Sequence, residues 1–465
     1  MATDRGGGVA GGIGARPARG RARGVARLVA SAASLAAALV ADAPMAAEGR
    51  VLVSQTEVTQ GCTIQWSAPE TLRTAGGRLV MVDAPEIAPW GDRWAMVGRL
   101  ALETDTLGRV IRIPDAPHQY LRAGFLLRDD EIVEPIPAPD VEAIGSPRIA
   151  PVSSDRALLV WGTPRDMETT VDEIWSAEYD GAGWSNVQRV IGGDEFAWSP
   201  TYHSRLVASG NELRLLAGRR GLLDDSGAVF LRRSGGSWTT VPLRMPSTSY
   251  IQLAELPGDT MVVAFVAGAA PHGNTLFARR FDLRGNAIGE PVRVSPPDAG
   301  VVYDMRIVAS RDSILHVVWP GWPSPSSGAL AGQNLPRMYV ARSADQGRTW
   351  RVTAGPPVDL RRPSALTAMV DASGAVHVST RIQRGSISWP GHLTWWSGSW
   401  HVSGPPIVPD AALVGAPVVL ALTTDSLRMI WNIDRLSDRV GGTVTSPGMM
   451  LSSRGALSCT SQRLQ

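Results

Sequence analysis

Three arginines occupy the same position in three segments of the chain that align without gaps. The segments are Arg148 to Trp161, Arg205 to Gly218 and Arg306 to Trp319. Each reads as a strand, a polar turn and a second strand. A guanidinium group offers a fork of N–H donors that matches a carboxylate. If this position begins the innermost strand of a ring of repeats, the three side chains would form a cationic cup for an anionic ligand.

A second interpretation of these arginines is that they cap strand ends or pair with turn carboxylates. All 45 basic residues are arginine, so the choice of arginine at any one position carries little information. Under the first interpretation, several neighbouring polar residues would share the rim of the cup. They are Tyr202, His203, Tyr250, Tyr303 and Asp304.

Other chemistries have weaker support in the sequence. The 7 histidines show no metal-ligand spacing, and the chain has neither a nucleophile elbow nor a phosphate-binding loop. Paired acids such as Asp172 and Glu173 could serve a glycosidase, but neighbours in a strand point to opposite faces. We therefore predict no metal and no cofactor, and we assign no catalytic residue.

The elements that must position the arginines are short strands. Runs rich in Val, Leu, Ile and Trp are broken by Gly, Pro, Asp and Asn, and the hairpin described above recurs about every 54 residues. Each hairpin is followed by a second landmark, an apolar strand, a turn and a Trp, as at Trp184, Trp238, Trp350 and Trp400; the copy after Gln252 has the segment from Phe281 to Asn286 instead of the Trp. Two hairpins per repeat predict an all-β propeller of four-stranded blades.

The repeat predicts about seven blades, with six as the alternative. Six repeats are visible from about residue 146 to 458, and residues 75–145 would form a seventh, irregular one. The last repeat lacks its outermost strand, which the segment from Cys62 could supply, closing the ring beside Cys459. A disulfide between these two cysteines is expected in an oxidising compartment; the alternative is two unrelated buried thiols.

One turn carries a recognisable motif, S-x-D-x-G-x-T-W. Its residues are Ser343, Asp345, Gly347, Thr349 and Trp350. The motif resembles the Asp box, or BNR repeat, of the sialidase (neuraminidase) superfamily of β-propellers. The resemblance implies a structural role for the box, in which Asp accepts backbone N–H bonds, Gly supplies a positive φ and Trp packs between sheets.

The same resemblance implies a glycan as ligand and an arginine cluster as its carboxylate-binding site. The sequence departs from a working sialidase, because Arg148 lies in SPRIA instead of the expected F/Y-R-I-P, and no Tyr follows residue 339 to act as nucleophile. We therefore expect binding without sialidase catalysis. A sialidase-like glycoside hydrolase and a protein-interaction scaffold remain the alternatives.

The first 47 residues resemble an export signal, with an arginine-rich start, an apolar stretch from Leu28 to Ala41 and small residues before residue 48. The predicted organisation is a signal over residues 1–47, a short segment over 48–61, the propeller over 62–459 and a tail over 460–465. The net charge of +2 does not favour nucleic acid. We expect a secreted or periplasmic monomer without a membrane span in its mature form.

Overall fold

The computed structural model describes most of the chain between Glu57 and Cys459. The described residues are 57–59, 62–74, 77–90, 93–104, 110–111, 124–128, 131–135, 145–166, 170–191, 197–200, 207–209, 212–220, 228–243, 245, 251–267, 275–297, 299–302, 304–323, 336–358, 366–384, 387–406, 413–423, 426–434, 439–440, 443–444 and 449–459. The expected export signal lies outside them. Within them, no helix is both long enough and apolar enough to cross a bilayer.

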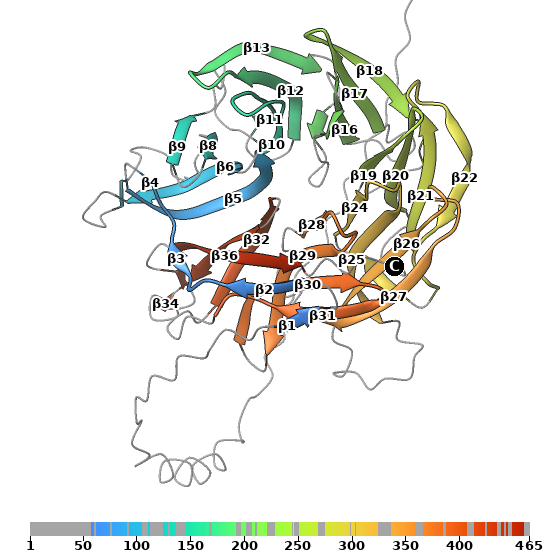
Figure 1. Ribbon diagram of the computed structural model, residues 1–465. Coiled ribbons are helices and arrows are strands. Elements are labelled where there is room, and N and C mark those ends of the chain that lie inside the picture. Colours follow the sequence, from blue (N-terminus) through green and yellow to red (C-terminus); the bar gives the residue numbers. More distant parts are fainter. Residues whose placement is uncertain are drawn as a thin grey trace, which may run out of the picture. The chain divides into compact units, whose positions relative to one another are not determined.

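The described residues form seven antiparallel sheets of four or more strands and one small hairpin, and we number the seven sheets as blades in chain order (Figure 1). Blade 1 contains β4 (Arg73–Thr74), β5 (Gly77–Trp90), β6 (Arg93–Thr104), β7 (Val110–Ile111), β8 (Gly124–Arg128) and β9 (Glu131–Pro135). Blade 2 contains β10 (Gly145–Pro151), β11 (Ala157–Asp166), β12 (Thr170–Tyr179) and β13 (Trp184–Ile191). Blade 3 contains β14 (Ala197–Pro200), β15 (Val207–Ser209), β16 (Glu212–Arg220), β17 (Ala228–Ser234) and β18 (Ser237–Leu243).

The later blades follow the same pattern. Blade 4 contains β19 (Ile251–Leu256), β20 (Thr260–Ala267), β21 (Thr275–Asp282) and β22 (Ala287–Arg293). Blade 5 contains β23 (Ala299–Val302), β24 (Arg306–Ala309), β25 (Leu315–Pro323), β26 (Arg337–Ser343) and β27 (Arg351–Pro357). Blade 6 contains β28 (Thr367–Val370), β29 (Val376–Arg384), β30 (Ile387–Trp396) and β31 (Ser399–Ser403).

Blade 7 joins the two ends of the described chain. It contains β32 (Leu413–Leu422), β33 (Ser426–Asp434) and β36 (Met449–Cys459), followed by β2 (Cys62–Trp66) and β1 (Glu57–Thr59), while β3 (Glu70–Thr71) also pairs with β36. A small separate hairpin consists of β34 (Arg439–Val440) and β35 (Thr443–Val444). The segment from Cys62 therefore supplies the missing strand of the last repeat, as predicted.

The blades pack one against the next until the order of contacts returns to its start. Separate apolar clusters join blades 1 and 2, 2 and 3, 3 and 4, and 4 and 5. One cluster spans blades 5, 6 and 7, and another joins blade 7 to blade 1. This cyclic order confirms the propeller and decides for seven blades over six.

Burial along each blade explains its sequence pattern. β20, with neighbouring blades on both faces, is buried along almost its whole length, whereas the outermost strand β22 is mostly exposed. In blades 2, 4 and 6 the first strand lies on the inner side of the ring and the last strand on the outside (Figure 1). A residue near the start of a first strand is therefore close to the ring axis.

The backbone register places Cys62 directly opposite Cys459. Opposed residues in an antiparallel pair have Cα atoms about 4.5–5.5 Å apart, which lies within the range that a disulfide spans. The disulfide remains a prediction that this register favours.

Candidate ligand site on the innermost strands

Arg148 and Arg306 occupy equivalent positions on the innermost strands of blades 2 and 5. Arg148 pairs with Val160 across its hairpin, and Arg306 pairs with Val318. Each guanidinium folds back in the same way, with Nη1 donating to the carbonyl of the preceding residue at 2.9 Å and 2.8 Å. The sequence alignment thus corresponds to a repeated side-chain conformation.

An irregularity in the innermost strand precedes both arginines. In β10 the register shifts between Gly145 and Arg148, and in blade 5 the strand is split into β23 and β24 just before Arg306. Bulges and breaks of this kind re-aim side chains and are common beside functional sites. Arg306 begins its strand as expected, whereas Arg148 lies inside β10, after the bulge.

Asp304 holds Arg306 in place and also joins two blades. Its Oδ1 accepts hydrogen bonds from Arg306 Nη1 at 3.0 Å and from the backbone N–H of Met305 at 2.7 Å. Its Oδ2 accepts from the N–H of Leu366, at the start of blade 6, at 2.9 Å. Both oxygens of this buried carboxylate are therefore committed to the framework around Arg306.

Carboxylates on other innermost strands make similar contacts between blades. Glu86 Oε2 in β5 accepts from the N–H of Ile149 at 3.1 Å and lies 3.9 Å from Nε of Arg148. Glu255 in β19 forms an ion pair of 2.9 Å with Arg214 of blade 3. These pairs fix the inner strands and partly neutralise the positive charge expected there.

The two described arginines differ in how much of the guanidinium remains available. The side chain of Arg148 is 6% exposed and that of Arg306 is 18% exposed. Among the described residues, Arg306 donates hydrogen bonds through Nη1 only. Its Nε and Nη2 edge, the edge that binds a carboxylate in a bidentate manner, makes no hydrogen bond.

The structure tests the remaining members of the predicted site only in part. Asp304 and Arg306 lie together, and Arg148 belongs to a blade that is not adjacent to theirs. The other predicted members lie outside the described residues: Arg205, Tyr202, His203, Tyr250 and Tyr303.

The Asp box forms the turn between β26 and β27. Asp345 Oδ1 accepts from Ser343 Oγ at 2.7 Å and from the N–H groups of Arg348 and Thr349, and Oδ2 accepts from Thr349 Oγ1 at 2.6 Å. Burial alone would raise the pKa of Asp345, but these hydrogen bonds outweigh it and lower the pKa to about 2. Gly347 has a φ of +86°, and Trp350 packs on the apolar cluster between blades 4 and 5. The box is thus a closed structural turn, far along the blade from the inner strand.

Blade 6 contains a chain of buried polar side chains that was not predicted from the sequence. Asp371 Oδ2 lies 3.0 Å from His377 Nε2, His377 Nδ1 lies 3.1 Å from His392 Nε2, and His392 Nδ1 lies 2.9 Å from Ser403 Oγ. Trp66, on the closing strand β2, donates to Ser403 Oγ at 3.3 Å. We call these five residues the histidine chain.

The two ends of the histidine chain differ in the hydrogen bonds that they can make. An indole can only donate and an ionised carboxylate can only accept. Trp66 therefore donates to Ser403 Oγ, and His377 Nε2 donates its proton to Asp371. Burial, with a smaller contribution from His377, lowers the pKa of His392 well below its ordinary value, which favours the neutral imidazole of His392. No spacing in the sequence signals this arrangement, because it depends on strand register.

Within the described part of the chain, no group of three or more His, Cys, Asp or Glu side chains could hold a metal ion. The histidine chain is linked end to end and does not converge on a common point. Its geometry suits a structural clasp.

Comparison with known proteins identifies similarity in fold and nothing more specific. No protein-family model and no curated protein sequence matches the chain. A polysaccharide lyase of family PL25, an ulvan lyase, is similar in structure, with a TM-score of 0.51 and 10% identity over 83% of this chain and 95% of that one. The same lyase bound to -[GlcA(1-4)Rha3S]- matches equally well. The Trypanosoma rangeli sialidase matches with a TM-score of 0.43 and 11% identity over 80% of this chain and 60% of that one.

The chain therefore shares the β-propeller fold of carbohydrate-active enzymes, at an identity that establishes architecture only.

Proposed function

We propose that the protein is an exported β-propeller that binds an acidic carbohydrate at the inner strands, with Arg306 as the main anchor, and that it does not cleave its ligand. The observation that carries this proposal is the orientation of Arg306. Asp304 and the Met305 carbonyl hold one end of its guanidinium, the opposite edge makes no hydrogen bond to the described residues, and the side chain as a whole is 18% exposed.

A pre-oriented guanidinium favours binding because little rotamer freedom is lost when the ligand arrives. The break in the inner strand before Arg306 supports the same role, since it turns the side chain away from the regular ladder. The ligand's carboxylate or sulfate group would meet the Nε and Nη2 edge side-on.

The described inner-strand carboxylates favour binding over hydrolysis. A glycosidase needs two carboxyl groups about 5–10 Å apart, with both free to act on the sugar. Glu86, Glu255 and Asp304 instead accept hydrogen bonds or ion pairs that tie blades together. If these carboxylates acted in catalysis instead, the contacts that they make between blades would be lost.

The ulvan lyase is bound to -[GlcA(1-4)Rha3S]-, an acidic saccharide containing a glucuronate and a sulfated rhamnose. That ligand belongs to the lyase, and it guides only the choice of compounds to test here. Acidic oligosaccharides should be compared with neutral ones of equal length.

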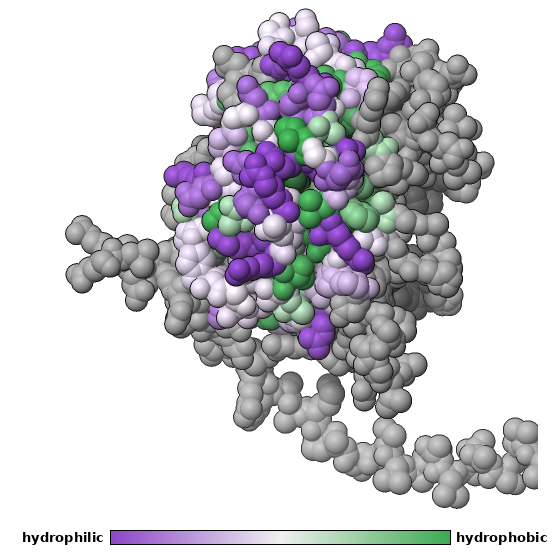
Figure 2. All heavy atoms as spheres, turned by 90° about the vertical axis from the view of Figure 1, so that its right-hand side faces the viewer, coloured by the Kyte–Doolittle hydropathy of each residue, from purple (hydrophilic) through white to green (hydrophobic). Residues whose placement is uncertain are grey.

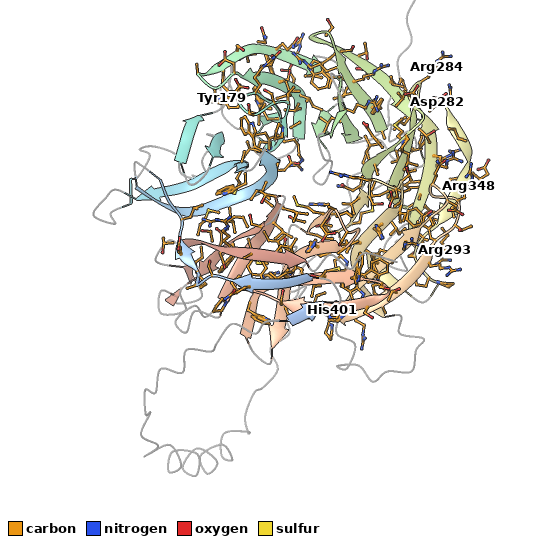
Figure 3. All side chains as sticks on the ribbon, in the orientation of Figure 1. Tyr179, Asp282, Arg284, Arg293, Arg348 and His401 are labelled. Atoms are coloured by element: carbon orange, nitrogen blue, oxygen red, sulfur yellow. The ribbon has the colours of Figure 1, made fainter. Side chains whose placement is uncertain are left out.

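The decisive experiment is isothermal titration of acidic oligosaccharides, chosen from a glycan array, into the wild type and Arg306→Ala. We expect at least a tenfold loss of affinity in the variant and a similar loss in Arg306→Lys, which keeps the charge and loses the fork. Arg284→Ala is the matched control, because Arg284 is exposed on the β21–β22 turn at the outer rim (Figure 3). Equal binding by wild type and Arg306→Ala, or release of cleaved sugar, would refute the proposal.

Export is the second part of the proposal. We expect the protein outside the cytoplasm, cleaved near residue 47. N-terminal sequencing of the extracytoplasmic protein tests this expectation, and an intact first segment would contradict it.

A further inference from the structure

A row of nitrogen-bearing side chains crosses the face of blade 5 that packs against blade 6. His316 on β25 pairs directly with Arg342 on β26, and Arg342 pairs directly with Arg351 on β27. Directly opposed residues project from the same face of a sheet, with Cβ atoms about 5 Å apart. The row therefore leads from a buried imidazole through a half-buried guanidinium to an exposed one.

None of the three side chains in this row has a partner of opposite charge. Among the described residues, neither Arg342 nor Arg351 forms an ion pair or a side-chain hydrogen bond. His316 is 2% exposed, and neither Nδ1 nor Nε2 has a hydrogen-bond partner. Asp345, in the turn that joins β26 to β27, has its carboxylate occupied by hydrogen bonds within that turn.

The opposite wall of this junction adds a further donor. The ring of Trp395, on β30 of blade 6, lies 5.3 Å from the imidazole of His316. The indole N–H group of Trp395 is buried and unpartnered. An imidazole, two guanidinium groups and an indole therefore lie along this junction, and the described residues provide no acceptor for them.

This arrangement is unfavourable without a ligand. Like charges directly opposite one another in a sheet are destabilising, and each buried polar group left unbonded lowers the stability of the fold. Buried unsatisfied groups in a native protein call for an explanation such as an unseen ion. Burial, with Arg342 adding to the effect, lowers the pKa of His316 to about 4, as expected for an imidazole that lacks an anion.

We propose that His316, Arg342 and Arg351 form a binding site for a tetrahedral oxyanion, sulfate or phosphate, either free or as an ester group on a larger molecule. The row and Trp395 together offer several donors from two blades, and an anion with four oxygens can accept from more of them than a two-oxygen carboxylate can. The two guanidinium groups hold the anion, and its charge favours the protonated form of His316.

The site is distinct from the inner-strand site around Arg306. Arg351 begins the outermost strand of blade 5, and the neighbouring Arg348 lies on the outer rim of the ring in Figure 3. Figure 2 faces this rim and shows hydrophilic side chains gathered in several patches. An anion bound here would lie at the junction of two outer strands and away from the axis.

The test measures thermal unfolding of the protein in sodium sulfate, sodium phosphate and sodium chloride at equal ionic strength. We expect sulfate or phosphate to raise the melting temperature by several degrees more than chloride, and Arg342→Gln/Arg351→Gln to abolish the difference. The control is Arg284→Gln/Arg293→Gln, which removes two rim arginines from blade 4 and should retain the gain. Arg306→Ala should also retain it, which separates this site from the proposed function.

A second readout follows the imidazole of His316 by NMR, with the signal assigned through His316→Phe. Sulfate should raise the pKa of His316 by about one unit or more. A sulfated oligosaccharide that binds at least tenfold more tightly than inorganic sulfate identifies an ester group as the ligand, and equal affinity identifies the free ion. The site is refuted if the double variant keeps the sulfate gain, if the control loses it, or if the pKa of His316 does not move.

Discussion

Buried histidine lies at both faces of blade 6, and the two faces differ in how those rings are bonded. Toward blade 7, His377 and His392 lie in a hydrogen-bonded chain that runs from Asp371 to Trp66 with every donor matched to an acceptor. Toward blade 5, Trp395 faces His316, whose two ring nitrogens are buried without a partner.

The comparison separates two uses of a buried polar side chain. A saturated chain contributes to stability and orders the seam where the closing strand β2 meets blade 6. A buried polar group without a hydrogen-bond partner lowers stability unless a bound ligand supplies that partner. The same residue type therefore indicates a clasp on one face and a ligand site on the other.

The largest expected effect concerns the pairing of β2 with β36, which closes blade 7. Cys459→Ser should lower the free energy of unfolding by about 2–5 kcal/mol, because the predicted disulfide closes a long loop. Urea denaturation with and without reductant measures the loss. Two titratable free thiols in the unreduced protein would show that the cysteines are not bonded and would leave the histidine chain as the principal clasp.

Replacing a histidine on each face of blade 6 should change the free energy of unfolding by unequal amounts. His392→Leu leaves His377 and Ser403 without their hydrogen-bond partner in a buried site. We expect the free energy of unfolding to fall by about 2–4 kcal/mol. His316→Leu removes an imidazole that has no partner, and we expect a change below about 1 kcal/mol in chloride buffer. Equal losses in urea denaturation would remove the distinction between the two faces.

The pH dependence of stability sharpens the same contrast. The pKa of His316 is about 4 when folded and ordinarily near 6.5, so the unfolded chain binds the proton more tightly. Stability is therefore full above pH 6.5 and falls as pH drops toward 4, by about 3 kcal/mol for this residue. His392 acts in the same direction. His316→Leu should flatten the profile, and an unchanged slope would contradict the assignment.

The smallest expected effect is at the end of the histidine chain. Ser403→Ala removes the hydroxyl that bridges Trp66 and His392, and we expect a loss of about 1–2 kcal/mol. Ser399→Ala, an exposed change at the start of the same strand, is the control. Thermal unfolding that is identical for both variants would show that the bridge does not fasten β2.

The fold could be predicted from the sequence because its cause is local and repeated. Each hairpin shows its turn, and the Trp after the second turn marks the packing between blades. The seven-blade count followed from treating the irregular residues 75–145 as a blade. The segment from Cys62 could be placed because the last repeat lacked a strand.

The functional residues were harder to predict because they depend on register. The shared position of Arg148 and Arg306 was visible by alignment, and so was Asp304, which lies two residues before Arg306. Glu86, which engages Arg148, comes from another segment and could not be found in this way. The row from His316 to Arg351 joins three strands whose pairing no sequence spacing reveals. The abundance of arginine made this row harder to predict, because in the sequence Arg342 does not differ from the other basic residues.

The pairing of β2 with β36 joins residues from opposite ends of the described chain. Such contacts give the protein a high contact order, and loop-closure entropy delays their formation. We therefore expect the first six blades to assemble before the seventh and the closing of the ring to be the slow step. Until that step, the unpaired edges of β2 and β36 would be open to pairing with other chains.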